Sequence, residues 1–269
     1  NHLLLWARES ATIGDVRGVD LASNLLEDCV SDSWKAAKMG AAFNRIGRFR
    51  ECMEKTKLYL SDVDCVAVFV GALLASGKAA EAVELGYDFR DEQNAMMAGT
   101  LGSALCQIGK IELGIESLRR AIELAQEEED LATLSRSWHG LAIAYQRSSR
   151  QEEAVGAYEQ AIQFSNPISY ISRSINFGTL LQDLGTWSEA ERRFRESLSR
   201  ALILGNTKDQ SQSGVNLGNL LVLGGQLEEG FRVAQWTESL CAKHGLTYPR
   251  AMTLLILTES FLERGDPLG

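Results

Sequence analysis

The sequence predicts an all-α protein built as a stack of antiparallel helix pairs. Three observations predict this fold: a short phrase recurs at near-regular steps, an apolar stripe with helical spacing precedes each copy, and small residues recur at one place in that stripe. Of the 269 residues, 45% are hydrophobic and 23% are charged, so the chain has enough apolar surface to bury a core.

The recurring phrase, Gly-x-x-x-Glu-small with some drift, marks the turn inside each predicted helix pair. Its six clear copies begin at Gly47, Gly77, Gly109, Ser149, Gly185 and Gly225, at steps of 30, 32, 40, 36 and 40 residues. Weaker copies at Gly14 and Gly265 extend the pattern toward both ends. We therefore expect a single solenoid over residues 1–269, with about seven helical hairpins and a final helix.

The apolar stripe predicts the first helix of each pair. Before Ser149 it consists of Trp138, Leu141, Ala142 and Tyr145, at the i, i+3, i+4, i+7 spacing that lines one face of an α-helix. The third member of the stripe is small in five of the six copies. Because paired helices approach to about 8–10 Å only where the side chains between them are small, this residue marks the crossing point.

The second helix follows each phrase, and residues 138–167 show the complete pattern. After the stripe come Ala154, Tyr158, Ala161 and a closing Pro167. The pattern resembles the tetratricopeptide repeat family, and the later steps of 36–40 residues are similar to its long-repeat variant. The resemblance implies a right-handed superhelical solenoid whose concave groove receives peptides, and it implies no catalysis.

The first repeats depart from the family pattern. Thr56 and Gly86 occupy places where the second helix of the family carries a large residue, and the first two steps fall short of the family's usual length. We therefore expect irregular repeats over residues 1–95 and well-matched repeats over residues 96–250.

The resemblance also predicts which first-helix residues line the groove. With the small crossing residue counted as position 8, the groove positions are 2, 5, 6, 9, 12 and 13; this count includes Val215 and Val222 among the groove residues. The polar candidates for peptide binding are Arg136, His139, Gln146, Arg147, Asn176, Thr179, Gln182, Asp183, Gln212, Asn216 and Asn219.

Two pairs of these candidates suggest specific chemistry. Asn176 and Asn216 occupy the same position of consecutive repeats, and a carboxamide can both donate to and accept from the backbone of an extended peptide. Arg136 and Arg147 suit an acidic side chain or a C-terminal carboxylate. The alternative is that these polar residues simply form a solvated face, and that His139 is an ordinary polar residue rather than a pH-dependent contact.

Composition argues against several other classes of function. The formal charge of −9 provides no positive field for nucleic acid or for anionic lipid, and the longest apolar run, residues 65–75, is too short to span a bilayer. The five scattered cysteines and three distant histidines form no local metal motif. We expect a cytoplasmic protein that is not an enzyme and has no cofactor.

The last predicted helix has more apolar side chains than one neighbour can bury; they are Leu254, Leu255, Ile256, Leu257, Phe261 and Leu262. This surplus suggests a fragment, or a surface that pairs with another domain or a second copy. Three functions follow as hypotheses: a scaffold that binds an extended peptide of a partner protein, a sensor arm of a larger ATPase, protease or transcription activator, and a dimerisation module.

Overall fold

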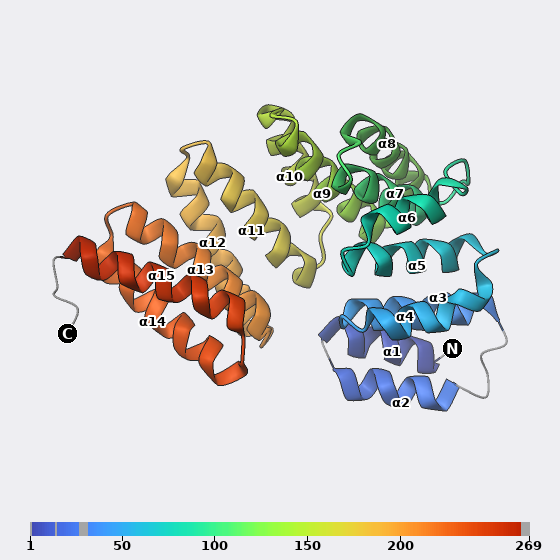
Figure 1. Ribbon diagram of the computed structural model, residues 1–269, viewed down its shortest axis with the longest axis horizontal. Helices are drawn as coiled ribbons and strands as arrows, with labels where there is room; N and C mark the ends of the chain where they lie inside the picture. The colour runs from blue at the N-terminus through green and yellow to red at the C-terminus, as the bar shows by residue number, and fades with distance from the viewer. Residues whose placement is uncertain (1, 14, 27–31, 265–269) are drawn as a thin grey trace. The chain divides into compact units, whose positions relative to one another are not determined.

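The computed structural model describes residues 2–13, 15–26 and 32–264, and over these ranges the chain is α-helical without strands (Figure 1). The predicted all-α solenoid of helix pairs is confirmed. Gly14, Cys29 and Gly265 lie outside the described residues.

The chain divides into two compact units, residues 1–164 and 165–269, where the sequence pattern predicts one continuous solenoid. Unit 1 contains α1 (His2–Ile13), α2 (Val16–Leu26), α3 (Ser33–Arg45), α4 (Phe49–Thr56), a short 3-10 helix (Lys57–Tyr59), α5 (Val63–Ala75), α6 (Ala79–Tyr87), α7 (Ala95–Gln107), α8 (Ile111–Glu127), α9 (Leu131–Arg147) and α10 (Gln151–Gln163). Unit 2 contains α11 (Pro167–Asp183), α12 (Trp187–Ile203), α13 (Thr207–Leu223), α14 (Leu227–His244) and α15 (Thr247–Arg264).

The residues that connect the two units correct one expectation. Pro167 does not close α10, which already ends at Gln163, but is the first residue of α11. Proline is tolerated there because the first backbone N–H groups of a helix lack partners within the helix. Asn166 caps the same helix, since its side chain accepts hydrogen bonds from the backbone N–H groups of Ile168 and Ser169.

The same kind of cap recurs at the start of six first helices, α3 to α13. In each of them an Asp or Asn side chain accepts a hydrogen bond from a backbone N–H of the first turn; the caps are Asp32, Asp62, Asn94, Asp130, Asn166 and Asn206. These caps fix where each first helix begins and therefore the register of its inner face.

The turns inside the hairpins use the residues that begin the recurring phrase. The backbone at Gly47, Gly77, Gly109, Gly185 and Gly225 has a positive φ, and Ser149 adopts the same conformation with φ 59°. Gly205 and Gly245 also have positive φ, and Gly245 is the left-handed C-cap of α14. Glycine adopts this conformation at little cost, which explains why the phrase begins with it.

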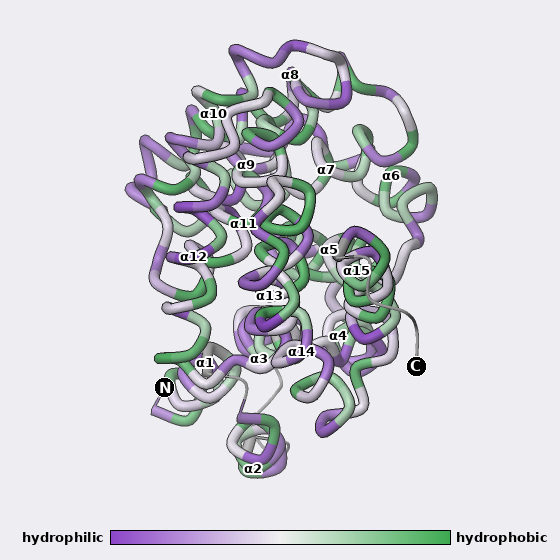
Figure 2. Tube along the Cα trace, turned by 90° about the vertical axis from the view of Figure 1, so that its left-hand side faces the viewer, coloured by the Kyte–Doolittle hydropathy of each residue, from purple (hydrophilic) through white to green (hydrophobic). Residues whose placement is uncertain are grey.

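Small side chains do lie where paired helices cross. Ala142 of α9 and Ala154 and Ala161 of α10 are completely buried, and Tyr158 fills the space beside them at 1% exposure. Figure 2 shows that hydrophobic and hydrophilic residues alternate around the helices, as expected for helices with one buried face.

The second helices are short in the early hairpins. Helix α4 has 8 residues and α6 has 9, whereas α8 has 17. Thr56 and Gly86 are both buried at their ends, and a Cβ on Gly86 would lie only 2.9 Å from Cε of Met97. The small residues therefore occur near the ends of short second helices, where the next hairpin packs too closely to leave room for a large side chain.

Candidate functional site

Unit 1 contains a groove of about 570 Å³ that is lined mainly by its first helices. We call it the unit 1 groove. Its lining residues come from α1, α3, α5, α7 and α9 and from the ends of their neighbours; they are Leu4, Leu5, Arg8, Trp34, Ala37, Lys38, Ala41, Asp64, Val68, Asn94, Met96, Glu128, Asp130, Ala132, Thr133 and Arg136.

The groove combines apolar, basic and acidic side chains. Leu5 and Trp34 are 50% and 42% exposed, so each offers apolar surface to a ligand. Asp64 is held in place, because Nδ2 of Asn94 donates to its Oδ1 at 2.8 Å. Oδ1 of Asn94 also caps α7. Helix α7 therefore fixes the position of Asn94 and, through it, the carboxylate of Asp64.

Arg136, a sequence candidate, lies in this groove. Its Nη2 donates to Oγ1 of Thr133 at 3.0 Å, and Asp130 attracts it electrostatically. The side chain of Arg136 is exposed at the groove surface, yet partial desolvation by its surroundings lowers its pKa, and attraction to Asp130 opposes the shift. Arginine nevertheless stays charged in proteins, so a partly dehydrated cation is available to a carboxylate.

Asp130 supports this arrangement from the start of α9. Its Oδ1 accepts hydrogen bonds from the backbone N–H groups of Ala132 and Thr133. Burial raises the pKa of Asp130, but the hydrogen bonds from Thr133 and Ala132 and the charge of Arg136 outweigh it and lower the pKa overall. The carboxylate is therefore ionised and attracts Arg136 electrostatically.

The structure places two other candidates of α9 against their own hairpin. The ring of His139 makes an edge contact with Tyr158 of α10, with centroids 5.8 Å apart. The hydroxyl of Tyr158 donates to Oε1 of Gln146 at 3.2 Å, and burial raises the pKa of Tyr158 to about 12. Both candidates therefore help to hold α9 against α10.

Arg147, at the end of α9, also has a partner within the chain. Its Nη1 donates to the backbone oxygen of Cys106, in the last turn of α7, at 3.2 Å. A cation suits the carbonyl end of a helix, so this contact stabilises the packing of α9 on α7. Arg147 is absent from the lining of the unit 1 groove, and the structure thus separates it from Arg136.

The remaining candidates lie on α11 and α13 of unit 2, which pack against each other. Asn176 and Asn216 are both half-buried, and Oδ1 of Asn216 accepts from Nε2 of Gln212 at 3.4 Å. Oγ1 of Thr179 donates to the backbone oxygen of Ile175. Three further candidates lie on these two helices: Asp183 is exposed, and Gln182 and Asn219 are half-buried.

Two groove positions of the sequence count face the next hairpin instead of open space. Val215 and Val222, at positions 5 and 12 of α13, are 6% and 4% exposed and belong to one core cluster with Ile256 of α15. These two residues are not groove residues. The reason is that consecutive first helices within this unit pack side by side, so each covers one flank of the helix before it.

Sequence reasoning did not single out the early first helices, although the same count identifies them. Trp34 and Asp64 are at position 2 of their helices, and Lys38 and Val68 are at position 6. Arg136 is also at position 2. Position 2 of α3, α5, α7 and α9 and position 6 of α3 and α5 therefore contribute to one surface in unit 1, including the repeats that depart from the family pattern.

A larger hollow of about 1010 Å³ lies beside α6 and α8 in unit 1. Its arginines are already bound within the chain: Arg120 donates to backbone carbonyls of the loop after α6, Arg119 donates to the hydroxyl of Tyr145, and Arg90 lies over the ring of Tyr87. Because these arginines already have partners within the chain, they are not available to bind a ligand in the hollow. The unit 1 groove is therefore the candidate site.

Among the described residues, no group of three or more His, Cys, Asp or Glu side chains is arranged to hold a metal ion. Of the helices in the described ranges, none combines the length and the apolar character needed to cross a bilayer.

The stacked hairpins and their inner groove define a helical-repeat protein. Residues 93–166 match the sequence profile of the tetratricopeptide repeat family. The matched segment, which spans α7 to α10, is thus a stretch of tetratricopeptide repeats, in a fold that generally serves as a non-catalytic scaffold for protein–protein interaction. No curated protein matches the chain significantly.

Solved structures with the same fold cover almost the whole chain. The Cut9–Hcn1 hetero-tetramer of APC/C matches with a TM-score of 0.70 and 14% identity, over 96% of this chain and 48% of that chain. A signal transduction ATPase with numerous domains and a tetratricopeptide repeat sensor, from Pyrococcus horikoshii, matches with a TM-score of 0.68 and 10% identity, over 94% and 43%. The apo quorum sensor NprR from B. thuringiensis matches with a TM-score of 0.65 and 13% identity, over 97% and 80%.

At these identities the likeness shows the fold alone. The chain spans slightly less than half the length of the first two of these proteins.

Proposed function

We propose that this protein is a cytoplasmic, non-catalytic scaffold that binds an extended peptide segment of a partner protein on its first helices. The observation that carries the proposal is the unit 1 groove, in which the exposed side chains of Trp34 and Arg136 line one hollow of about 570 Å³. An apolar surface and a fixed cation in one groove suit a peptide with a large apolar residue and a carboxylate.

The carboxylate of the peptide would come from an acidic side chain or from its C-terminus, and Arg136 would bind it. Asp130 and Thr133 hold this guanidinium in position, so little side-chain entropy is lost on binding. Arginine matters here for its shape as well as its charge, because its fork can make two parallel hydrogen bonds to a carboxylate.

This part of the proposal is tested with a random peptide display library selected against the immobilised protein. We expect the enriched peptides to carry an acidic residue or a free C-terminus together with a large apolar residue. Arg136→Ala should weaken their binding by about 10- to 100-fold, since a hydrogen bond to a charged group is worth about 1.5–3 kcal/mol.

The matched control is Arg50→Ala, which removes an arginine whose side chain is 87% exposed on α4 and which does not line the groove. Its affinity for the selected peptides should equal that of the unchanged protein. Equal loss in both variants would mean that general charge, and not the groove, attracts the peptides.

In unit 2, we propose that Asn176 and Asn216 hold the backbone of a peptide, with Gln182 and Asp183 beside them. Their equivalent positions on the packed helices α11 and α13 support this role. Replacing both asparagines by Ala should weaken binding by roughly 1–3 kcal/mol for each buried contact that is lost. If the double variant bound every selected peptide with unchanged affinity, this role of the two asparagines would be excluded.

A second candidate function is that of a sensor arm in a larger regulator. It is favoured by the fold likeness to the tetratricopeptide repeat sensor of a signal transduction ATPase and to a quorum sensor. The coding sequence next to this segment separates the two functions, because a nucleotide-binding, protease or DNA-binding motif in the same reading frame favours the sensor arm.

A further inference from the structure

Position 2 of successive first helices in unit 1 alternates between apolar and charged side chains. It is Trp34 on α3, Asp64 on α5, Met96 on α7 and Arg136 on α9, and all four residues line the unit 1 groove. These helices pack against one another in the order α3, α5, α7, α9. The groove therefore offers an aromatic ring, a carboxylate, a thioether and a guanidinium in sequence, one from each helix. We call these four residues the position 2 row.

The carboxylate of this row is held in place but can still bind a cation. The side chain of Asp62 accepts a hydrogen bond from the backbone N–H of Asp64 at 3.0 Å, and Nδ2 of Asn94 donates to Oδ1 of Asp64 at 2.8 Å. Asp64 is half-buried, and within the described ranges no cation forms an ion pair with it. Because a carboxylate has about four acceptor sites, Asp64 can accept further hydrogen bonds from a cationic group of a ligand.

The two charges of the row are not paired with each other. Arg136 is attracted by Asp130 and donates to Oγ1 of Thr133, and in the described part of the chain no ion pair joins it to Asp64. Met96, on the helix between them, is half-buried and offers apolar surface. A ligand that follows the row thus meets a negative and a positive group separated by an apolar one.

The spacing of the helices favours one backbone conformation of a bound peptide. Packed helices lie about 8–10 Å apart. A polyproline II segment has about three residues per turn and rises about 3.1 Å per residue, so every third side chain points the same way, at steps of about 9.3 Å. In a β-strand the side chains on one face repeat at only about 6.6 Å. The polyproline II repeat therefore matches the position 2 row, and the strand repeat does not.

We propose that the unit 1 groove binds a polyproline II segment of a partner protein with an apolar, a basic, an apolar and an acidic residue at every third place. These four residues meet the position 2 row in order from α3 to α9. The inference rests on the proposed function and adds to it the basic residue, the spacing and the backbone conformation of the peptide. Such a segment loses little conformational entropy on binding, because its backbone is already extended.

Fluorescence polarisation with labelled synthetic peptides tests the spacing. The probe is Leu-Pro-Ser-Lys-Pro-Ser-Leu-Pro-Ser-Glu with both ends blocked, in which proline favours polyproline II. Further peptides place the same four contact residues two or four places apart, and each peptide is made in both directions of the chain. We expect the three-residue spacing to bind at least about 10-fold more tightly than the others in one of the directions. Equal affinities at all spacings overturn the proposal.

Replacement of Lys by Gln in the probe tests the role of Asp64. The unchanged protein should bind the Lys probe at least about 10-fold more tightly than the Gln probe, because a hydrogen bond between two charged groups is lost. Asp64→Asn keeps an acceptor for Asn94 and should bind both probes as the unchanged protein binds the Gln probe. Asp91→Asn is the matched control, since this side chain is 81% exposed and does not line the groove, and it should keep the preference for Lys. The same preference in all three proteins overturns the proposal, as does its absence from the unchanged protein.

Arg136→Ala distinguishes failure of this inference from failure of the proposed function. This variant should weaken the Lys and Gln probes by the same factor and so keep the preference for Lys. If Arg136→Ala weakens peptide binding but no protein prefers Lys, the proposed function stands and the inference is wrong. If neither these probes nor any peptide selected by display binds, both are wrong.

Discussion

A Cβ atom on Gly102 would lie 2.9 Å from the carbonyl oxygen of Gly114, and a Cβ on Gly114 would lie 2.8 Å from the carbonyl oxygen of Gly102. Helices α7 and α8 therefore meet with backbone against backbone, and no side-chain rotation can make room for a methyl group. This contact fixes the distance between the two helices of the fourth hairpin, whose first helix contributes to the unit 1 groove.

The first prediction is that Gly102→Ala destabilises the protein by about 1–3 kcal/mol through overpacking, as judged by urea unfolding followed by circular dichroism. Gly156→Ala is the matched control, because Gly156 lies inside α10, is exposed and has no atom within 4 Å of a built Cβ. It should instead stabilise by about 0.5–1 kcal/mol, since alanine favours helix more than glycine does. Equal effects of the two changes would contradict the close contact.

Three glycines at the crossing position show how far the sequence predicts the fold. Gly102, Gly178 and Gly218 are each the third member of the apolar stripe in their repeat, so the sequence pattern does not distinguish them. In the structure a Cβ on Gly178 would meet the ring of Phe194 at 2.6 Å, whereas one on Gly218 would have its nearest atom at 3.6 Å, an ordinary contact. The pattern predicts that helices cross at these residues, but the closeness of each crossing depends on the opposite side chain.

The candidate site was less predictable, because its contacts join distant parts of the chain. Arg136 is found by counting along its helix. Arg147 is identified by the same count, yet its hydrogen bond reaches Cys106, 41 residues earlier, which no local pattern indicates. Trp34 is harder to identify from the sequence because the early repeats lack the family's large second-helix residues, although their first helices keep the position count.

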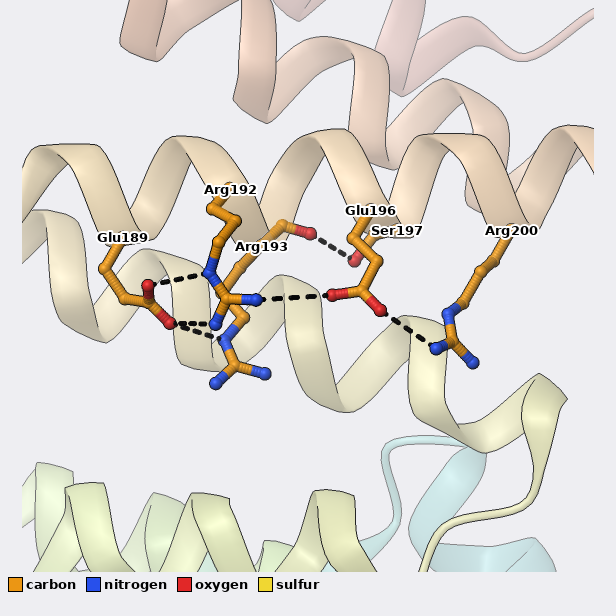
Figure 3. Close-up of polar contacts among 6 residues, drawn as sticks. All are labelled: Glu189, Arg192, Arg193, Glu196, Ser197 and Arg200. Atoms are coloured by element: carbon orange, nitrogen blue, oxygen red, sulfur yellow. Dashed lines mark hydrogen bonds and ion pairs between the residues drawn. The ribbon is translucent and has the colours of Figure 1, made fainter.

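The second prediction concerns a ladder of ion pairs along α12 (Figure 3). Glu189 accepts hydrogen bonds from both Arg192 and Arg193. The side chain of Arg193 is 15% exposed and lies over the ring of Phe177 at 5.0 Å, whereas Arg192 is 56% exposed. Arg193→Ala should therefore cost about 1–2 kcal/mol of stability, and Arg192→Ala less than about 0.5 kcal/mol, by urea unfolding. The reverse order would show that the exposed pair matters more than the packed one.

The third prediction is the pH dependence of this ladder. The hydrogen bond from Arg192 lowers the pKa of Glu189, and the nearby charges of Arg192 and Arg193 add to the shift. Because the pKa is lower in the folded state than in the unfolded state, the contribution of Glu189 to stability is present above the unfolded value near 4.5 and is lost as the pH falls. The difference in unfolding midpoint between the unchanged protein and Glu189→Gln should shrink between about pH 7 and about pH 3. A difference that grows toward acid pH would contradict this sign.

The fourth prediction concerns the loop after the short helix α6. Arg120 of α8 donates to the backbone oxygens of Arg90, Asp91 and Glu92, at 3.0, 2.9 and 3.3 Å. This single side chain joins α8 to three successive residues of the loop. Since hydrogen bonds from a charged group are worth about 1.5–3 kcal/mol, its removal should make local opening of the loop at least about 10-fold more frequent.

Limited trypsin digestion measures this opening, because trypsin cleaves after Arg90, where the loop is held. Arg120→Met should be cut between Arg90 and Asp91 at least about 10-fold faster than the unchanged protein, as followed by mass spectrometry of the fragments. Arg119→Met removes the neighbouring arginine, whose Nη2 donates to the hydroxyl of Tyr145 instead, and should be cut there at the original rate. Equal rates in all three proteins would mean that the segment between α6 and α7 is held by its own turns rather than by Arg120.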